Sequence, residues 1–269
     1  MKKVVNKNSK KNIKSKKIPA INVIVFFVLR FLVVLCMVAQ SIHGNWNNVF
    51  LCILTLILFT FPVLIQKTLK VEFPKTLEII IYLFIFSSEI LGEIQNFYGV
   101  FAHWDTMLHT LNGFLCAAVG FSMVDLLNRR ENNINMTPVF LAFVSMCFSM
   151  SMGILWEFVE YGVDTYLGQD MQKDRIIKNI NSKELGNKEI NEKVGINDIY
   201  KTIIYYDSDK QYIIENGYLD IGLKDTMKDL FVNFIGALIF SLLGLLYVKD
   251  RDEYRFIERF IPIVKKIKE

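Results

Sequence analysis

The sequence predicts an all-α polytopic membrane protein with six transmembrane helices and one small external insertion between the fifth and sixth helices. Three observations support this fold class. Hydrophobic residues make up 52% of the 269 residues. They gather in runs of about 20 residues, which is the length that an α-helix needs to cross a bilayer. Lysines and arginines are concentrated in some of the intervening segments and absent from others, as they are in multi-pass proteins.

Six apolar runs are long enough to span a membrane, and we expect a helix in each. The first five fall within residues 18–163, and the sixth falls within residues 225–248. The first run is too long for the apolar core of a signal peptide and lacks a clear cleavage site, so we expect it to remain as a helix. The six runs cover residues 18–42, 46–65, 77–98, 104–127, 138–163 and 226–248.

Both ends of the chain are basic. Residues 1–17 contain eight lysines and few apolar side chains, which predicts a disordered cytoplasmic tail that sets topology, with no role in binding nucleic acid. Residues 249–269 alternate basic and apolar side chains. This pattern predicts a cytoplasmic amphipathic tail, in the form of an interfacial helix that Pro262 interrupts.

The external insertion covers residues 164–224 and is polar. Within it, two β-prone segments, residues 200–206 and 211–215, flank the turn-forming residues 207–210. This arrangement predicts a β-hairpin. We expect residues 173–197, which are rich in Asn, Lys and Glu, to be helical or loosely structured.

The distribution of basic residues predicts the orientation. The two tails and the loops 67–75 and 128–137 would share one side of the membrane, and they hold 20 of the 31 lysines and arginines. The short loops on the other side, 42–45 and 99–103, hold none. The chain is therefore expected in the cell membrane, with cytoplasmic termini and residues 164–224 outside.

Three carboxylates stand at the outer end of the fifth span. At about 100° per residue, Glu157, Glu160 and Asp164 fall on one narrow stripe of a helix. An acid in a membrane helix costs roughly 2.5–3.5 kcal/mol on insertion scales, so three on one face require a partner or a wet cavity. We interpret the stripe as part of a functional site.

Two further helices bring polar side chains to the same depth. The fourth span begins with Asp105 and continues on one stripe with His109 and Asn112, and the sixth begins with Asp225 and continues with Asp229 and Asn233. Asp105 and Asp225 could instead be helix N-caps. The inner halves of these spans carry few polar residues.

A histidine surrounded by carboxylates favours a divalent cation, and the residue types fit Zn²⁺, Mn²⁺ or Mg²⁺. The expected ligands are His109, Glu157, Glu160 and Asp229. Asp105 would accept a hydrogen bond from the other ring nitrogen of His109 and orient it. The remaining polar residues would support these ligands or face a substrate: Asn112, Asp164, Asp225, Lys228 and Asn233.

Three groups of residues have other interpretations. Lys228 offers an alternative to a metal ion, because its ammonium could neutralise the adjacent Asp229 without a bound metal. Arg30 and Glu89 lie at similar depths of two parallel spans, which predicts a structural ion pair. All four cysteines lie inside apolar runs without C-x-x-C spacing, so we assign them no disulfide or metal role.

The motifs resemble a known group of membrane proteins. Asp105-x-x-x-His109, Glu157-x-x-Glu160 and Asp229-x-x-x-Asn233-x-x-Gly236 resemble the VanZ-like membrane proteins. Trp104-Asp105, Trp156-Glu157, the element 166–170 (Tyr-Leu-Gly-Gln-Asp) and the element 225–229 (Asp-Thr-Met-Lys-Asp) are closer to the YjdF-like inner-membrane branch. The similarity covers most of residues 77–247. In that branch the Gln-Asp element runs directly into the last helix, whereas about 50 residues intervene here.

The resemblance implies a role in the cell envelope and names no substrate. The leading hypothesis is a metal-dependent activity on a lipid or lipid-linked envelope substrate, in a site open to the outer leaflet. One alternative is a cation- or proton-coupled transporter, which would be expected to carry polar residues through to the inner leaflet. The other is a non-catalytic membrane scaffold whose polar groups pair with one another.

Overall fold

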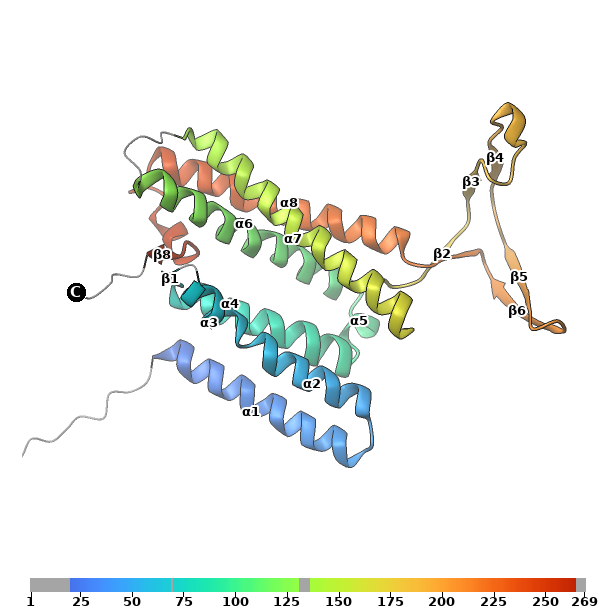
Figure 1. Cartoon of the computed structure of the whole chain (residues 1–269), viewed down its shortest axis with the longest axis horizontal. Coiled ribbons are helices and arrows are strands. Elements are labelled where there is room, and N and C mark those ends of the chain that lie inside the picture. The colour runs from blue at the N-terminus through green and yellow to red at the C-terminus, as the bar shows by residue number, and fades with distance from the viewer. Residues whose placement is uncertain (1–19, 69, 131–135, 265–269) are drawn as a thin grey trace, which may run out of the picture.

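A computed structural model describes residues 20–68, 70–130 and 136–264. The expected basic tail, residues 1–17, lies outside these ranges. Long helices run alongside one another, and a group of short strands projects from one end of the bundle (Figure 1). Among the described residues, five helical segments are long and apolar enough to cross a membrane: Ile21–Ile42, Trp46–Thr68, Trp104–Asn128, Pro138–Leu167 and Leu223–Lys249.

The first two expected spans form α1 (Ile21–Ile42) and the pair α2 (Trp46–Leu58) and α3 (Phe61–Thr68). The second span is interrupted because Pro62 has no backbone N–H and cannot continue a helix from α2. It occupies the first turn of α3, where that missing donor would have no partner in any case.

The third expected span is not one uniform α-helix. The α-helical part, α4 (Lys75–Phe86), continues directly into the π-helix η1 (Ser87–Ile94), so neither part reaches the length of the five long segments. A π-helix is rare in proteins and is often found at functional sites. Here the Ser87 carbonyl accepts a hydrogen bond from Trp104 Nε1 at 3.3 Å. A short helix, α5 (Phe97–Val100), follows.

The last three spans form α6 (Trp104–Arg130), α7 (Pro138–Leu167) and α8 (Leu223–Lys249), each somewhat longer than expected. The ends of α7 show why the boundaries lie where they do. The Thr137 hydroxyl caps the helix by accepting from the Phe140 N–H at 3.2 Å, with Pro138 next in the first turn. Gly168 ends it in the left-handed conformation, with φ of 63°.

Two glycines allow α6 and α8 to approach closely. A β-carbon at Gly113 of α6 would collide with the carbonyl oxygen of Asn233, and one at Gly236 of α8 would collide with that of Thr110. In lipid, helix association depends on such contact because the surrounding chains are as apolar as the helices. The two glycines therefore set the distance between these helices.

Buried hydroxyl and amide groups link the same three helices. Ser145 and Ser149 of α7 donate to the carbonyls of Ala117 and Gly113 on α6, at 2.7 and 2.8 Å. Asn112 Nδ2 donates to Asn233 Oδ1 at 3.1 Å, which joins α6 to α8. These groups satisfy one another where no water is available, so the helices are held in one register.

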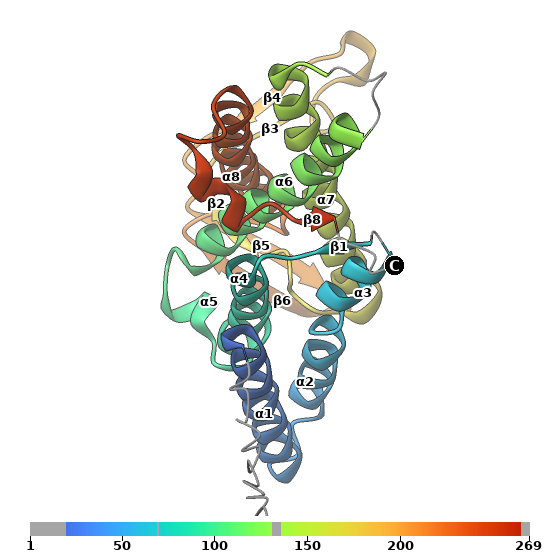
Figure 2. The same cartoon turned by 90° about the vertical axis from the view of Figure 1, so that its left-hand side faces the viewer.

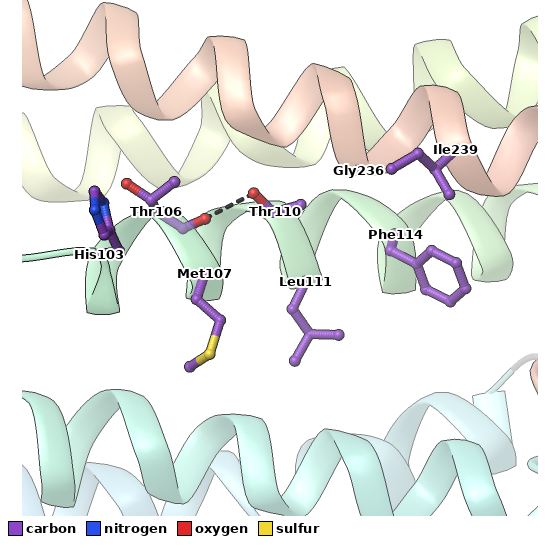
Figure 3. A pocket seen from close by; sticks show the side chains of 8 residues that line it. All are labelled: His103, Thr106, Met107, Thr110, Leu111, Phe114, Gly236 and Ile239. Atoms are coloured by element: carbon purple, nitrogen blue, oxygen red, sulfur yellow. Dashed lines mark hydrogen bonds between the residues drawn. The ribbon is translucent and has the colours of Figure 1, made fainter.

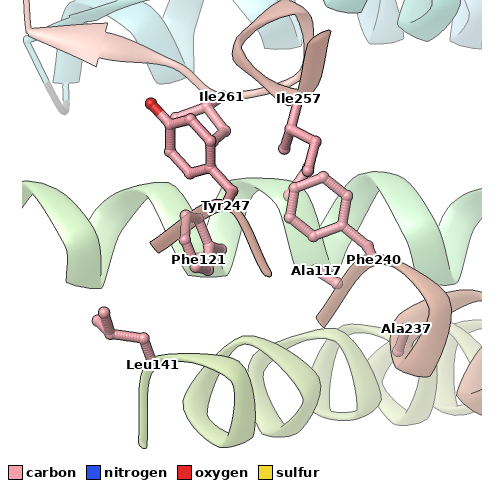
Figure 4. Packing of buried hydrophobic residues seen from close by; sticks show 9 residues of the cluster. Ala117, Phe121, Leu141, Ala237, Phe240, Tyr247, Ile257 and Ile261 are labelled. Carbon is pink, nitrogen blue, oxygen red and sulfur yellow. The ribbon is translucent and has the colours of Figure 1, made fainter. Parts of the chain in front are cut away.

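The apolar core of α6–α8 lies toward the end of these helices that is away from the insertion. Figure 4 shows how its side chains pack. Phe121 of α6 and Phe240 of α8 are fully buried, with ring centroids 6.0 Å apart. Ile257 and Ile261, from the segment after α8, complete this core. The C-terminal segment thus belongs to the folded bundle.

The C-terminal segment differs from the expected amphipathic helix. After α8 the chain turns, forms the 3₁₀ helix η3 (Arg255–Arg259), and ends its described part as β8 (Ile263–Val264). This strand pairs antiparallel with β1 (Val71–Glu72). The prediction of an interfacial helix was wrong because Ile257 and Ile261 pack into the core, with Phe260 against it, while Phe256 and Ile263 stay exposed.

The insertion contains three antiparallel strand pairs. The predicted hairpin is confirmed as β5 (Lys201–Tyr206) and β6 (Lys210–Glu215), and Asp207 and Ser208 between them take positive φ values, as tight hairpin turns require. Residues 173–197 are mainly strand and loop, and a single 3₁₀ turn, η2 (Lys188–Ile190), is the helical element described there. The other strands pair as β2 (Arg175–Ile177) with β7 (Tyr218–Asp220), and β3 (Ile180–Ser182) with β4 (Val194–Ile196).

The helices form two groups. Viewed along the bundle, α6, α7 and α8 lie on one side, α1 and α2 lie on the other, and α4 lies between them (Figure 2). The start of α1 and the strand β8 lie at one end of the bundle, and the insertion lies at the other (Figure 1). Both described ends of the chain thus share one end.

The glycine contact predicts the effect of a single methyl group. Gly236→Ala should lower the thermal stability of the purified protein by about 1–3 kcal/mol, the usual cost of overpacking a close contact. Gly162→Ala is the matched control, because a β-carbon at Gly162 of α7 meets nothing within 4 Å. Thermal unfolding in detergent measures both. Equal stability of the two variants would contradict the described approach of α6 to α8.

Candidate functional site

Three ligand-type side chains meet at the end of the bundle where α6 and α8 begin. His109 Nε2 lies 3.4 Å from Asp105 Oδ1, one turn earlier on α6, and 3.9 Å from Asp229 Oδ2 on α8. One ligand atom from each residue falls within 4.8 Å of the others, a spacing that suits a metal ion. The expectation that Asp105 would bond to the other ring nitrogen of His109 was wrong, because the same Nε2 faces both Asp105 and Asp229. Asp105 thus stands in this group as a ligand-type residue.

Lys228 belongs to the same group. Its Nζ donates to Asp105 Oδ2 at 2.7 Å and to Asp229 Oδ1 at 3.4 Å. Asp229 is almost fully buried at 2% exposure, whereas Lys228 is 36% exposed. The ammonium therefore lies between the buried carboxylates and the exterior, where it offsets part of their charge.

The two glutamates of α7 adjoin this group. Glu157 and Glu160 share the buried face of α7 with Ser149 and Gly153, because residues three or four apart lie on one side of a helix. Glu160 Oε1 accepts from Trp156 Nε1 at 2.8 Å. Among the described residues, no hydrogen-bond partner reaches the buried Oε2 of Glu157. His109 lies close enough to both glutamates to interact with them electrostatically.

Asp164 and Asp225 hold the start of the insertion. The Asp164 carboxylate accepts from the backbone N–H groups of Met171 and Gln172, at 2.6 and 2.8 Å. Asp225 accepts from the Lys173 N–H at 3.0 Å and from Arg175 Nη2 at 2.6 Å. This bond to Asp225 raises the pKa of the Arg175 guanidinium. The N-cap interpretation of Asp225 was wrong, since Gly222 is the N-cap of α8 and Asp225 lies inside the first turn. It was wrong for Asp105 as well, because α6 begins at Trp104 and Asp105 lies inside its first turn.

Asn112 and Asn233 lie deeper than the ligand-type group. Their amides bond to each other, and Asn233 Nδ2 also reaches the Ser149 carbonyl at 3.4 Å. Asn233 is 1% exposed. In this position they join α6, α7 and α8 beneath the site.

The expected ion pair between Arg30 and Glu89 is absent from the described part of the chain. The Arg30 guanidinium lies over the Phe26 ring, 4.7 Å from its centroid, and its buried Nε has no hydrogen-bond partner there. The bond from Asn22 Nδ2 to Glu78 Oε2, at 2.6 Å, sets α1 and α4 in register. Arg30 follows Asn22 on α1 by as many residues as Phe86 follows Glu78 on α4, so Arg30 and Phe86 lie at the same level. Glu89 lies three residues beyond Phe86, which is about 4.5 Å further along the helix axis.

Glu89 faces the neighbourhood of the site instead. It is 7% exposed, and its Oε1 lies 3.4 Å from Ser88 Oγ, which is in turn 3.3 Å from the Tyr98 hydroxyl. Asp105 is among the charged neighbours of Tyr98. The polar region at this end of the bundle thus extends from α7 and α8 across to η1.

Comparison with known proteins places the whole helical region in one family. A family described as predicted membrane protein (DUF2238) matches residues 22–250. The chain belongs to the DUF2238 family. The match includes every residue of the site on α6, α7 and α8, together with the insertion.

One relative of this DUF2238 protein comes from Thermotoga maritima and is described as an uncharacterized protein. It is 26% identical over 108 residues, which make up 39% of this chain and 53% of the relative. The match thus spans about half the length of that relative. No solved structure matches.

Sequence reasoning missed a second buried charge at the opposite end of the bundle. Asp125 of α6 is 1% exposed and accepts from Arg251 Nη2 at 2.9 Å. The Arg251 guanidinium also lies over the Tyr247 ring, 4.8 Å from its centroid. A single acid near the end of an apolar run was the available signal, because an acid within a membrane helix implies a nearby partner.

The bond between Arg175 and Asp225 predicts a stability effect. Arg175→Met leaves the buried Asp225 carboxylate without its guanidinium, which should lower stability by about 1–3 kcal/mol. Lys210→Met is the matched control, because Lys210 pairs with the exposed Asp207, and exposed pairs contribute roughly 0–1 kcal/mol. Thermal unfolding of the purified variants measures the difference. Equal losses would show that Arg175 does not support Asp225.

Proposed function

We propose that this DUF2238 protein binds one divalent cation at the outer end of α6–α8 and uses it in a reaction on a lipid or lipid-linked envelope substrate. The observation that carries the proposal is the meeting of Asp105, His109 and Asp229, whose ligand atoms lie within 4.8 Å. Glu157 and Glu160 would supply further oxygen donors. A site of one imidazole and several carboxylates suits Zn²⁺, Mn²⁺ or Mg²⁺.

The local charge balance supports a cation. Four carboxylates (Asp105, Glu157, Glu160, Asp229) are gathered around His109, and Lys228 is the ammonium in contact with two of them. A ligating imidazole is neutral, so a large negative excess would remain in a poorly hydrated place. A divalent cation would offset most of it. The unpaired Oε2 of Glu157 is the kind of buried acceptor that a cation or its bound water would satisfy.

The chemistry would be metal-assisted hydrolysis or transfer. A bound divalent ion polarises a phosphoryl or carbonyl oxygen and lowers the pKa of a coordinated water. Whichever of Glu157 and Glu160 does not bind the ion would be placed to accept a proton as a general base. The resemblance to VanZ-like proteins, through the YjdF-like branch, agrees with an envelope substrate.

The proposed setting is the cell membrane, crossed six times, with α4 and η1 as the third span. The shared end of α1 and β8 supports this number, because a chain that crosses an odd number of times would begin and end on opposite sides (Figure 1). The distribution of basic residues puts both termini in the cytoplasm and residues 164–224 outside.

Lys228 supports a second candidate function, a non-catalytic scaffold in which the ammonium neutralises Asp105 and Asp229 without a metal.

The observation that bears on the transporter alternative is the set of buried serines Ser145, Ser149 and Ser241, which extend polar groups further along α7 and α8 than the sequence indicated. Two of these three hydroxyls donate to backbone carbonyls of α6, so they serve helix packing instead of forming a continuous relay.

Metal analysis tests the proposal directly. The purified protein should carry about one Zn²⁺, Mn²⁺ or Mg²⁺ per chain, and His109→Ala should remove it. His43→Ala is the matched control, because His43 lies in the exposed turn between α1 and α2 and should leave the metal in place. Protein without stoichiometric metal, and unchanged in thermal stability on adding each of the three ions, would overturn the proposal.

Lys228→Met separates the metal site from the scaffold. With a metal, loss of the competing ammonium should preserve or raise metal occupancy, since the ion itself neutralises the carboxylates. If the protein binds no metal, Lys228→Met leaves the carboxylates of Asp105 and Asp229 without a neutralising charge. Stability should then fall by roughly 3–5 kcal/mol, as it does when a buried ion pair is broken. Metal content and thermal unfolding of the same preparation distinguish the two results.

The orientation has its own test. A membrane-impermeant thiol reagent should label Ser208→Cys, in the β5–β6 turn, in intact cells, and it should label Asp252→Cys only after the cells are opened. The wild-type protein, with its four native cysteines, reports the background. Labelling of Asp252→Cys in sealed cells would reverse the proposed topology and move the site to the cytoplasmic side.

A further inference from the structure

An apolar groove runs along α6 on the side of the helix that faces α4. Its volume is about 400 Å³. His103 stands at its outer end, Phe114 lies at its inner end, and Gly236 and Ile239 of α8 form one wall (Figure 3). From His103, just before α6, to Phe114 there are eleven steps along the chain, which correspond to about 16 Å along the helix axis. The groove is therefore elongated along the direction in which a lipid chain lies.

The walls present hydrocarbon although two of the lining residues are threonines. The Thr110 hydroxyl donates to the Thr106 carbonyl at 2.7 Å, which satisfies its polar group within the helix (Figure 3). Met107 and Leu111 point from α6 toward the ribbon of α4 in the same view. Gly236 carries no side chain, so nothing projects from α8 into the groove at that point.

The inner end of the groove is rigid. The Phe114 ring makes edge-to-face contacts with Phe240 and Phe260, at centroid distances of 5.0 and 5.3 Å. Aromatic pairs of this kind hold a side chain in one orientation. The groove is thus a preformed feature with a fixed floor, and its volume lies in the range of sites that hold small ligands.

The outer end of the groove lies toward Lys228, the ammonium of the site. On α8, Lys228 lies about three turns before Ile239 of the groove, so the two side chains share one face of the helix, and Lys228 Nζ is bonded to the Asp105 carboxylate. An ammonium has three donors, and the contacts with Asp105 and Asp229 use two. The third remains for a headgroup oxygen, and Lys228 is exposed enough at 36% to be reached.

We propose that this groove holds one acyl chain of an anionic glycerophospholipid, which is the substrate of the adjoining site. The phosphate would then meet Lys228 beside Asp105, His109 and Asp229, while the acyl chain extends to Phe114. The assignment of the lipid as a substrate rests on the proposed function. The assignment of the groove as a lipid site rests on its shape, its lining and the charge at its outer end.

Native mass spectrometry of the full chain in detergent tests the lipid site, with phosphatidylglycerol and phosphatidylcholine of identical acyl chains as probes. The wild type should retain one phosphatidylglycerol per chain, roughly tenfold more readily than phosphatidylcholine, because Lys228 can donate to either phosphate but the choline cation of phosphatidylcholine cancels the headgroup charge that attracts the ammonium. Lys228→Met should remove that preference without preventing retention of lipid.

Ile239→Trp should fill the groove and lower phosphatidylglycerol retention by about tenfold or more, because the added ring occupies the space of the chain. Ile154→Trp is the matched control, since Ile154 lies at a similar distance from the outer end of α7, is 41% exposed and does not line the groove. Both variants should keep the metal content of the wild type.

Unchanged lipid retention in Ile239→Trp would overturn the inference, and so would a wild type that retains no phosphatidylglycerol. Disulfide cross-linking of Met107→Cys between copies in membranes would also overturn it, because the groove would then be a contact between two chains. If Ile239→Trp loses lipid while the wild type carries no metal, the lipid site stands and the proposed reaction fails.

Discussion

The close approach of α6 to α8 is the contact on which the rest of the structure depends. Gly113 and Gly236 bring the two backbones together, and the amides of Asn112 and Asn233 fix their register. In a bilayer the hydrophobic effect does not drive helices together, so packing and interhelical hydrogen bonds must do so. The register set in the middle of these helices determines which side chains meet at the end where both helices begin.

The site follows from that register. Asp105 and His109 belong to the first turns of α6, and Asp229 belongs to the second turn of α8, so the three meet because these two helices start at one level. The insertion closes the same end of the bundle from outside, through the contacts of Asp225 with Arg175 and with the Lys173 backbone. The insertion thus contacts the first turn of α8 next to the site, although it supplies no ligand-type residue to the site.

Charge is arranged differently at the two ends of the bundle. At the end that carries the insertion, carboxylates outnumber the cations in contact with them, which favours the binding of a further cation. At the other end, Asp125 is bonded to Arg251, and the segment after α8 packs over the apolar core. Buried acids need compensation wherever they occur. The two ends therefore differ in charge balance: Asp125 has a guanidinium partner, whereas the carboxylates at the insertion end exceed the cations that contact them.

The sequence by itself determined the helical class, the positions of the long apolar helices, the β5–β6 hairpin and the gathering of polar residues at one end, because these depend on run length, periodicity and turn residues. Only the tertiary structure decided which of those residues meet. Arg30 and Glu89 miss each other by a few residues of register, and Lys228 enters the cluster because α8 lies directly against α6. Such pairings depend on the distance and register of packed helices, which a linear pattern does not contain.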